Sequence, residues 1–480
     1  MGNKNLPFWL LLLSLCLVLV VYPLIQDGMF MDGMIYTAVG KNLANGLGTF
    51  WHPHFAKALM PVYHEQPPLM FGMEAVFFWL LGNSMYVERL YAFIMFLISG
   101  FLIHLIWRQW FINEKAVRNF SWFPLILWVI VPVVYWAVSN NVEENTMVAF
   151  VLASFYSIQR GVIQGKNTLL WLLAAGLFIL GAGLCKGVQG MFTVSVVFFY
   201  WLFFRRLTFI QMVKYSLVLI FPTVVFAVIA YLSPEIERSF QMYYTRRIVN
   251  TFINTGMATT QFRYYLAAQL FNELIPSLVV LLVVLVTGWK IKYRIPDFRS
   301  RLNDSIYLIF IGLSGSMPLL VTLEQRRFYL VTAMPFFILA ITIFAAPVLS
   351  DLMAQLKNES RGFRVYRWVV VVLLTGTLAF SLTGVGKTKR DAAMIGDVHL
   401  IGAVVGQGSL VSIPASLFEE WALHAYFNRY YYVSLTTDST SLYLIKNAND
   451  QAVSPEGYDI INLPTERYKL YRKKSTGESK

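Results

Sequence analysis

Residues 8–25 read FWLLLLSLCLVLVVYPLI, a run without a single charged side chain. A stretch of this length and polarity can cross the hydrocarbon core of a bilayer as one helix. Comparable apolar runs follow at 90–107, 122–138, 146–158, 169–184, 188–204, 212–232, 264–288, 305–322, 328–347 and 368–384. Together they predict an all-α polytopic membrane protein with about eleven transmembrane helices, some of them tilted or extended into flanking residues.

The composition supports this class. The 480 residues are 57% hydrophobic and 14% charged, and the mean hydropathy is +0.57. A soluble domain of this size could not bury so much apolar surface, so lipid must act as part of the solvent. Basic residues cluster in alternate loops, for example Arg205 with Arg206, and we expect these loops to be cytoplasmic. The net charge of +13 therefore needs no nucleic-acid partner.

Beyond residue 386 the apolar runs give way to short mixed segments. Segments 410–414, 430–435, 441–445, 458–462 and 467–471 are typical of strands, with helical patterns near 391–405 and 415–428. We therefore expect two domains, a transmembrane domain over 1–385 and a small α/β domain over 386–480 on the outer face. Segments 26–85 and 233–262 are predicted to lie on the same outer face.

The outer segment 26–85 contains an unusual number of titratable side chains for a chain of this composition: Asp27, Asp32, His52, His54, His64 and Glu65. Asp32 begins an amphipathic helical stretch that ends on glycines. The later apolar piece 70–81 is too short to span a bilayer and predicts a helix that lies in the interface. This arrangement suits an enzyme whose substrate has a lipid tail and a reactive head group.

Several short motifs appear in a characteristic order: Asp32-Gly-x-x-Tyr36, Glu65-Gln-Pro-Pro-Leu69, Arg89-Leu, Leu184-Cys-Lys-Gly187 and Arg327-Phe-Tyr-Leu-x-x-Ala-Met-Pro335. In this order they resemble the bacterial membrane glycosyltransferases of the GT-C class. The branch that they resemble contains the lipid A aminoarabinose transferases and the dolichyl-phosphate-mannose protein mannosyltransferases. The resemblance extends from about residue 8 to residue 347 and implies a protein of the bacterial inner membrane whose active site faces the outside.

The resemblance implies a hexosyl- or pentosyltransferase with a polyprenyl-phosphate-linked sugar donor and a lipid, glycan or protein acceptor. Asp32 holds the place of the base that deprotonates the acceptor, and Glu65 matches an orienting carboxylate of the site. Where the family often has Lys, this chain has Gln66, so other cations must hold the donor phosphate. The candidates lie at or near the predicted outer ends of spans: Lys186, Arg246, Arg247, Arg263, Arg326 and Arg327.

Further residues are candidates for the acceptor site or the cavity wall: Asp27, Tyr36, His64, Glu143 and Glu144. Because a polyprenyl phosphate is already an activated leaving group, transfer needs an aimed acceptor, a base and cations, and no nucleotide-binding loop. A single displacement with one base inverts the anomeric centre. We expect inversion, mainly from the resemblance.

A divalent metal is an open alternative. In the aminoarabinose transferases the Glu pairs with a His of a later outer loop to hold a metal, which makes Glu65 a candidate ligand. This chain has no His between residues 233 and 262, so the second ligand of that site is in doubt. A two-His site from His52 and His54 is a weaker alternative, because the spacing does not fix a third ligand. The sequence indicates no other cofactor.

Structural roles and other functions also stay open. Asp32 could act as a helix cap, and Lys186 could extend along its span to the interface. A transporter or flippase of lipid-linked sugars would also need many spans and a basic cavity. It should, however, place charges inside its spans, whereas here nearly all lie at the ends. A sensor would instead place recognition in the outer tail.

Overall fold

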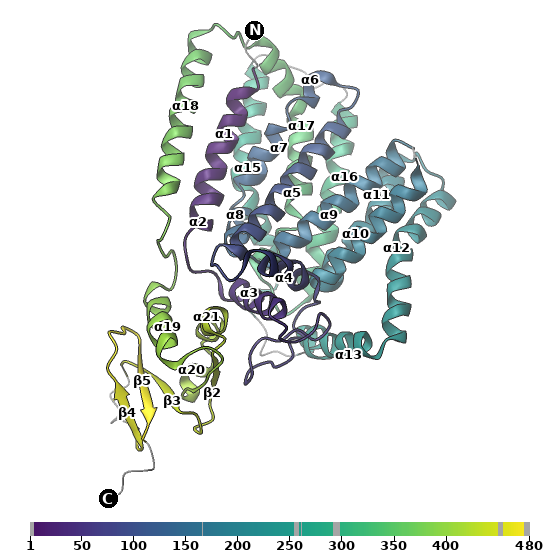
Figure 1. Cartoon of the computed structure of the whole chain (residues 1–480). Helices are drawn as coiled ribbons and strands as arrows, with labels where there is room; N and C mark the ends of the chain where they lie inside the picture. Colours follow the sequence, from purple (N-terminus) through teal and green to yellow (C-terminus); the bar gives the residue numbers. More distant parts are fainter. Residues whose placement is uncertain are drawn as a thin grey trace, which may run out of the picture. The chain divides into compact units, whose positions relative to one another are not determined.

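The structure is a computed structural model that describes residues 4–165, 167–253, 259–260, 262–290, 298–449 and 455–474. Helices make up most of these residues (Figure 1). The first half of the chain contains α1 (Leu6–Cys16), η1 (Leu17–Val21), α2 (Tyr22–Leu24), α3 (Met31–Ala44), α4 (Leu69–Leu81), α5 (Val87–Trp110), α6 (Lys115–Arg118), α7 (Trp122–Val129), α8 (Pro132–Ser139), α9 (Glu143–Ile158), η2 (Gln159–Ile163), α10 (Thr168–Lys186), η3 (Gly187–Val194), α11 (Ser195–Phe204) and α12 (Phe209–Leu232).

The second half continues with helices and ends in strands. It contains α13 (Pro234–Tyr243), η4 (Tyr244–Val249), α14 (Asn250–Ile253), α15 (Tyr265–Lys290), α16 (Phe298–Ser316), η6 (Met317–Val321), η7 (Arg327–Leu330), α17 (Met334–Gln355), α18 (Arg361–Leu382), α19 (Ala392–Val405), β1 (Leu410–Ser412), α20 (Ala415–Phe418), α21 (Trp421–Tyr431), β2 (Ser434–Thr436), β3 (Tyr443–Asn447), β4 (Tyr458–Ile461) and β5 (Tyr468–Lys473). The predicted class, a helical membrane protein with a small C-terminal α/β part, is confirmed.

Within the described residues, nine helices are long and apolar enough to cross a membrane, and the bent pair α7–α8 makes a tenth candidate. The pair bends by 73° just before Pro132, because proline disfavours a helical conformation of the residue that precedes it. One of the nine, Thr168–Phe204, has 37 residues. As one straight helix it would be about 55 Å long, against a hydrocarbon core of about 30 Å.

This long segment reverses its direction at Gly187. Gly187 has a φ of +71°, which glycine adopts without steric cost. Three residues later the backbone approaches so closely that a Cβ on Gly190 would collide with the carbonyl group of Ala182. The short helix η3 therefore folds back along α10, and α11 runs away from the turn. This reversal accounts for the two separate runs, 169–184 and 188–204, that the sequence predicts.

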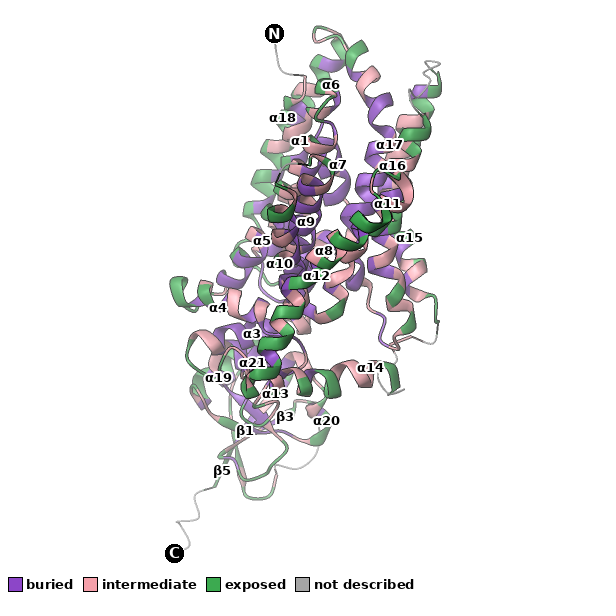
Figure 2. Cartoon of the chain, turned by 90° about the vertical axis from the view of Figure 1, so that its right-hand side faces the viewer, coloured by how far each residue is buried: buried purple, intermediate pink, exposed green. Residues whose placement is uncertain are grey.

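Burial distinguishes candidate spans that are surrounded by other helices from candidate spans at the periphery. In α9 with η2, and in α17, 67% and 72% of the apolar window is buried. In α12, at the periphery of the helices, the value is 11%, and Figure 2 colours much of its ribbon as exposed. Apolar side chains that point away from protein need lipid around them. The exposure of α12 therefore supports its prediction as a membrane span.

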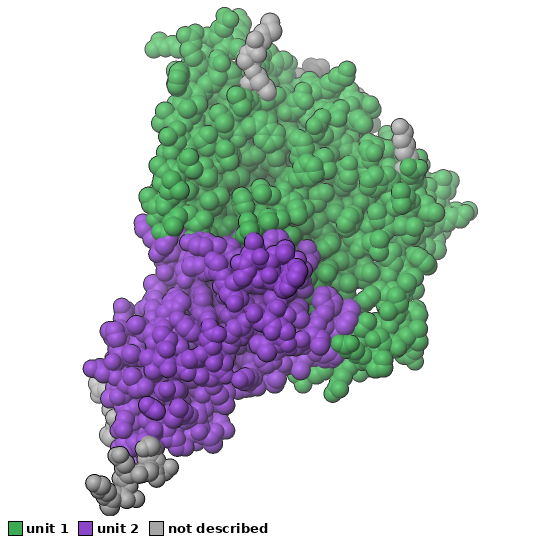
Figure 3. Space-filling view, viewed as in Figure 1, with its two compact units in different colours: residues 1–25, 65–69, 90–385 green, residues 26–64, 70–89, 386–480 purple. Residues whose placement is uncertain are grey.

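Contacts along the chain define two compact units (Figure 3). Unit 1 comprises Met1–Ile25, Glu65–Leu69 and Leu90–Val385, and unit 2 comprises Gln26–His64, Met70–Arg89 and Gly386–Lys480. The last segment of unit 2 begins at Gly386, the residue at which the expected C-terminal domain also begins. The outer segment differs, because the structure groups most of 26–89 with the C-terminal residues, whereas the sequence analysis assigns it to the transmembrane domain.

Unit 2 is built on a five-stranded sheet with the strand order β2-β1-β3-β5-β4. β1 is parallel to β2 and β3, and β5 is antiparallel to β3 and β4. The carboxylate of Asp397 in α19 accepts hydrogen bonds from the backbone N–H groups of Glu466, Arg467 and Tyr468. The strands agree with the predicted segments except at 430–435, where α21 extends to Tyr431 and β2 begins only at Ser434.

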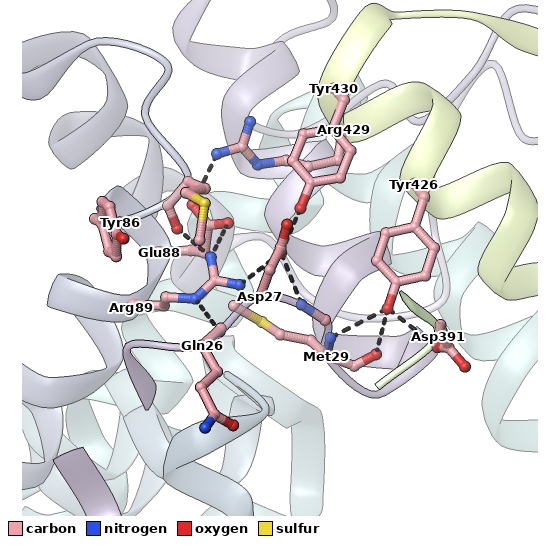
Figure 4. Close-up of polar contacts among 12 residues, drawn as sticks. Gln26, Asp27, Met29, Tyr86, Glu88, Arg89, Asp391, Tyr426, Arg429 and Tyr430 are labelled. Carbon is pink, nitrogen blue, oxygen red and sulfur yellow. Dashed lines mark hydrogen bonds and ion pairs between the residues drawn. The ribbon is translucent and has the colours of Figure 1, made fainter. Parts of the chain in front are cut away.

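A polar network explains why the outer segment belongs to unit 2 (Figure 4). Arg89 forms ion pairs with Asp27 at 3.0 Å and with Glu88 at 3.1 Å. The Tyr430 hydroxyl donates to Asp27 at 2.6 Å, and Arg429 pairs with Glu88 at 2.8 Å. Glu88 and Arg429 are buried. Buried charges are tolerated only when they are paired and hydrogen-bonded, so these contacts tie the segment to α21.

Candidate functional site

The main candidate site is a cavity of about 460 Å³ within unit 1. It lies at the reversal between α10 and η3, and segments η4, α14, α16 and η6 also contribute to its lining. Much of the lining is apolar: Val188, Met191, Phe192, Ile248, Phe252, Pro318 and Leu319. The remaining lining includes several polar or charged side chains: Gln66, Lys186, Gln189, Tyr243, Arg247, Glu324 and Tyr329. A cavity of this composition fits a ligand with an apolar chain and an anionic head.

The reversal at Gly187 also positions Tyr243. A Cβ on residue 187 would collide with the Tyr243 hydroxyl group, so only glycine lets this tyrosine approach. Burial raises the pKa of Tyr243 to about 12, and burial likewise raises the pKa of Tyr329. Both phenols therefore keep their protons at neutral pH and can donate hydrogen bonds to an anion in the cavity.

Arg247 lies in η4 between two carboxylates. Its guanidinium group is 2.7 Å from Glu324 Oε2 and 3.6 Å from Glu65 Oε2. Glu324 also pairs with Arg326 at 3.5 Å. The contact with Glu65 is long for an ion pair, and both of its side chains are partly exposed. Glu65 is thus the partner that an incoming anion could replace at lowest cost.

Lys186 ends α10 and is almost fully buried. Its ammonium group lies 2.6 Å from Glu144 Oε1 and 3.6 Å from Glu143 Oε2, and 4.8 Å from the centre of the Tyr329 ring. The two glutamates occupy the first turn of α9, where the helix dipole favours negative charge. With both carboxylates ionised, this cluster carries one more negative than positive charge. Lys186 is therefore already neutralised by protein side chains.

Glu65 gives the site a dependence on pH. Burial raises the pKa of its carboxyl group, and nearby Glu324 adds to this, while Arg247 and Arg246 oppose it. The pKa of Glu65 is higher in the folded protein than in the unfolded chain. Its contribution to the free energy of unfolding is therefore fully present below the pKa of the unfolded chain. It is lost as pH rises through the folded pKa.

We expect the affinity of this cavity for a ligand with an apolar chain and a phosphodiester head group to rise as pH falls through this raised pKa, because Arg247 then loses one competing carboxylate. The expected gain is about two- to fivefold, since a partly exposed ion pair contributes about 1 kcal/mol or less. A pH titration of binding by the purified protein measures it. Glu65→Gln should bind more tightly at neutral pH and lack this part of the profile. Identical profiles for wild type and variant would contradict the assignment.

Other candidate cations lie away from the cavity lining. Arg327 pairs with Glu273 at 3.5 Å and lies over the Trp136 ring. Arg246 and Arg263 are exposed, and neither is among the residues that line this cavity. The phosphate roles of these arginines stay predictions. Of the six candidate cations, the structure brings Lys186 and Arg247 to the cavity itself.

The remaining candidates belong to unit 2. Asp32 lies in the first turn of α3, where an extended segment meets the helix, and is half-buried. Tyr36 is buried against Phe71, and the His64 ring packs edge-on against His52. Asp27 belongs to the polar network of Figure 4, where its carboxylate has a structural role. The roles of these four residues toward an acceptor or in catalysis stay predictions.

The described part of the chain contains no cluster of side chains that would hold a divalent metal. Among those residues, no three His, Cys, Asp or Glu side chains lie close enough together to hold a metal ion. Glu65, the candidate ligand, pairs with Arg247 instead. The described residues therefore do not fit a resident metal at Glu65.

Sequence reasoning missed several lining residues: Gln66, Gln189, Tyr243, Glu324 and Tyr329. Gln66 and Tyr329 stand inside the quoted motifs, so the motifs contained a usable signal. Glu324 lies two residues before Arg326, the first of the two predicted arginines. An acidic residue at the end of a span is itself a signal of function. Tyr243 and Gln189 carry no local signal, because only packing brings them to the cavity.

Comparisons with known proteins agree with this architecture. The sequence matches the dolichyl-phosphate-mannose-protein mannosyltransferase family over residues 65–232. Crystal structures of ArnT from Cupriavidus metallidurans, bound to undecaprenyl phosphate and in the apo state, superpose with TM-scores of 0.62 and 0.60. Their sequence identities are 13% and 14%, and 98% of both chains is covered in each case.

A more distant similarity links the chain to an oligosaccharyltransferase of Archaeoglobus fulgidus in complex with Zn and sulfate. Its TM-score is 0.51 at 11% identity, over 92% of this chain and 67% of that one. No curated protein sequence matches this chain. The chain therefore has an ArnT-like GT-C fold and resembles the glycosyltransferases of that class.

Proposed function

We propose that this chain with an ArnT-like GT-C fold transfers a sugar from a polyprenyl-phosphate-linked donor to a lipid A, protein or glycan acceptor. The observation that carries the proposal is the unit 1 cavity, in which an apolar lining meets Arg247 and two protonated tyrosines. The crystal structure of ArnT bound to undecaprenyl phosphate shows that a chain with this fold accommodates such a lipid.

The cavity residues suggest how the donor binds. The polyprenyl chain would lie along the apolar lining, and its phosphate would take the place of Glu65 beside Arg247. Tyr243 and Tyr329 would donate hydrogen bonds to the remaining phosphate oxygens. Lys186 also lines the cavity, and its two glutamate partners hold it in place. Arg247 and the two tyrosines would offset the negative charge that develops on the phosphate as the glycosidic bond breaks.

In the proposed reaction, an acceptor oxygen forms a bond to the anomeric carbon of the donor sugar. The bond between this carbon and the phosphate oxygen breaks. The bonding electrons leave with the phosphate, and Asp32 takes the acceptor proton. One displacement of this kind inverts the anomeric centre. We place the reaction at the outer face of the bacterial inner membrane, on the basis of the basic residues in the opposite loops.

Two adjacent arginines provide a matched test. We expect Arg247→Met to weaken polyprenyl-phosphate binding about 10- to 100-fold, because a hydrogen bond to a charged group contributes about 1.5–3 kcal/mol. Arg246→Met removes the same charge from the neighbouring exposed position and should change binding little. The measurement is equilibrium binding of a fluorescent polyprenyl phosphate to each purified protein in lipid nanodiscs.

The function itself is tested with radiolabelled sugars on a panel of polyprenyl-phosphate donors, in native lipid extract. Labelled product from wild type, and less from Arg247→Met, supports the proposal, and the mass of the product identifies the acceptor. Consumption of no donor, together with movement of labelled lipid across a vesicle membrane, would overturn it in favour of a transporter of lipid-linked sugars.

A further inference from the structure

A second cavity of about 370 Å³ lies wholly within unit 2. The C-terminal ends of α3 and α21, the loop through His54 and the turn at Gly408 contribute to its lining. Its volume is in the range of small-ligand sites, about 300–1,000 Å³. Most of the residues that line it have neutral polar side chains, in contrast to the cavity of unit 1.

Two buried asparagines form one wall. Asn42 Nδ2 donates to the carbonyl groups of His54 and Phe55 and to Asn428 Oδ1, at 3.1, 2.7 and 3.0 Å. Asn42 Oδ1 is buried and finds no hydrogen-bond partner within the described part of the chain. A buried amide oxygen without a partner is costly, so the three bonds that Nδ2 donates must hold Asn42 in place, and through Asn428 they fix one polar wall of the cavity.

Three other side chains add hydrogen-bonding capacity. His54 Nδ1 lies 2.7 Å from the Pro61 carbonyl oxygen. A carbonyl group can only accept, so Nδ1 carries the proton of the neutral ring and Nε2 is left as an acceptor. Asn45 donates through Nδ2 to the Lys41 carbonyl group, which leaves its Oδ1 to accept. Gln407 is exposed and lines the same cavity.

An aromatic ring completes the lining. Tyr432 follows α21 with a φ of +56°, a conformation that bulky residues rarely adopt. The buried Lys41 amino group lies 3.7 Å from the centre of the Tyr432 ring and packs against that ring. Backbone strain of this kind persists where the surrounding structure enforces it, and it is common at ligand clamps.

The charges narrow the ligand class. The described residues that line the cavity include no carboxylate, and Lys57 is their one permanently charged side chain. Its ammonium group already donates to the Gly408 carbonyl group at 2.8 Å. A cation would find no counter-charge here, and a phosphate would find a single, engaged lysine. Amides, an imidazole acceptor and an aromatic ring instead match a sugar, whose hydroxyl groups both donate and accept and whose ring has an apolar face.

We infer that this cavity of unit 2 binds a neutral saccharide, and that the saccharide is part of the acceptor. The inference rests on the proposed function, because it names the acceptor class as a glycan or a glycan-bearing molecule. Asn45, Gln407, Asn428 and His54 would contact the hydroxyl groups, and Tyr432 would pack against the sugar ring. This site is separate from the donor cavity of unit 1 in the residues that form it.

The test is saturation-transfer NMR on the full chain in nanodiscs, with mannotriose and chitotriose as probes. We expect transfer to sugar ring protons for wild type. We expect about tenfold weaker binding for Asn45→Ala/Gln407→Ala, because two exposed amides lose their hydrogen bonds. Gln407→Glu provides a second variant of the cavity at an exposed side chain, and we expect weaker saccharide binding for it as well. Asn462→Ala, an exposed amide elsewhere in unit 2, should bind like wild type. A rate of proteolytic cleavage within unit 2 equal to that of wild type shows that each variant is folded.

The outcomes separate this inference from the proposed function. Unchanged saccharide binding in both pocket variants would overturn the inference. So would the absence of saccharide binding by a wild type that still transfers sugar, and in that case the proposed function stands. Binding of inorganic phosphate in place of the sugars would also overturn it. Saccharide binding that the variants lose, without any transfer from any donor, would support the pocket and refute the proposed function.

Discussion

Asp32→Asn should reduce sugar transfer about 10²- to 10⁴-fold, the usual contribution of a positioned general base. The substitution keeps the size of the side chain but removes its capacity to take the acceptor proton. Asp32 lies in the first turn of α3, where the helix dipole stabilises the carboxylate. The loss should appear in kcat, with the binding of polyprenyl phosphate unchanged, since no donor contact is assigned to this residue.

The measurement is a transfer assay with the purified protein, accompanied by lipid binding and by the rate of proteolysis within unit 2, which together show that the variant is folded. Asp438→Asn is a matched control, because Asp438 is an exposed aspartate of the same unit and its side chain accepts a local backbone hydrogen bond. Wild-type kcat in Asp32→Asn would refute the assignment of the base. A loss of lipid binding together with transfer would point to a structural role instead.

Glu88→Gln should destabilise unit 2 by about 3–5 kcal/mol, because removing one partner of a buried ion pair leaves the other charge uncompensated. Glu88 and Arg429 are both essentially inaccessible to solvent and lie 2.8 Å apart. Glu88 also pairs with Arg89, so one substitution affects two cations. The expected result is rapid proteolysis within unit 2, measured as the rate of cleavage of the full chain in nanodiscs.

Two comparisons sharpen this result. Glu419→Gln changes an exposed glutamate of the same unit and should leave the cleavage rate unchanged. In Glu88→Gln/Arg429→Met, loss of both charges should cost less than the sum of the single changes, because neither charge of that pair is left alone. Additive effects would show that the two residues do not depend on each other. Equal stability of Glu88→Gln and wild type would contradict the role of the network.

Much of the fold was predictable because it depends on local patterns. Apolar runs of spanning length predict the membrane helices, and the boundaries of α3 and α4 agree closely with the predicted stretches at Asp32 and 70–81. The turn between α10 and α11 was also predictable, since Lys186 and Gly187 interrupt the apolar run. By contrast, the grouping of the outer segment with the C-terminal residues depends on distant pairs such as Asp27 with Tyr430.

The candidate site was predictable only in part. The sequence predicts Lys186, Glu143 and Glu144 as separate candidates, but their ion pairs depend on how α9 packs against α10. Arg247 is one of several candidate cations in the sequence, and only the structure shows it between Glu65 and Glu324. A basic residue at the end of a span is equally consistent with anchoring to lipid head groups. Local sequence could not rank the arginines for this reason.

The amino-acid sequence by itself determined that the chain needs a lipid environment, where its membrane spans lie and which residue types are available for chemistry. These follow from side-chain polarity and from periodicity along a single helix, which need no knowledge of distant neighbours. Tertiary structure decided which charges meet, which tyrosines reach the cavity and which amides gather in unit 2. Such contacts join residues far apart in the chain, and their geometry depends on packing among many helices at once.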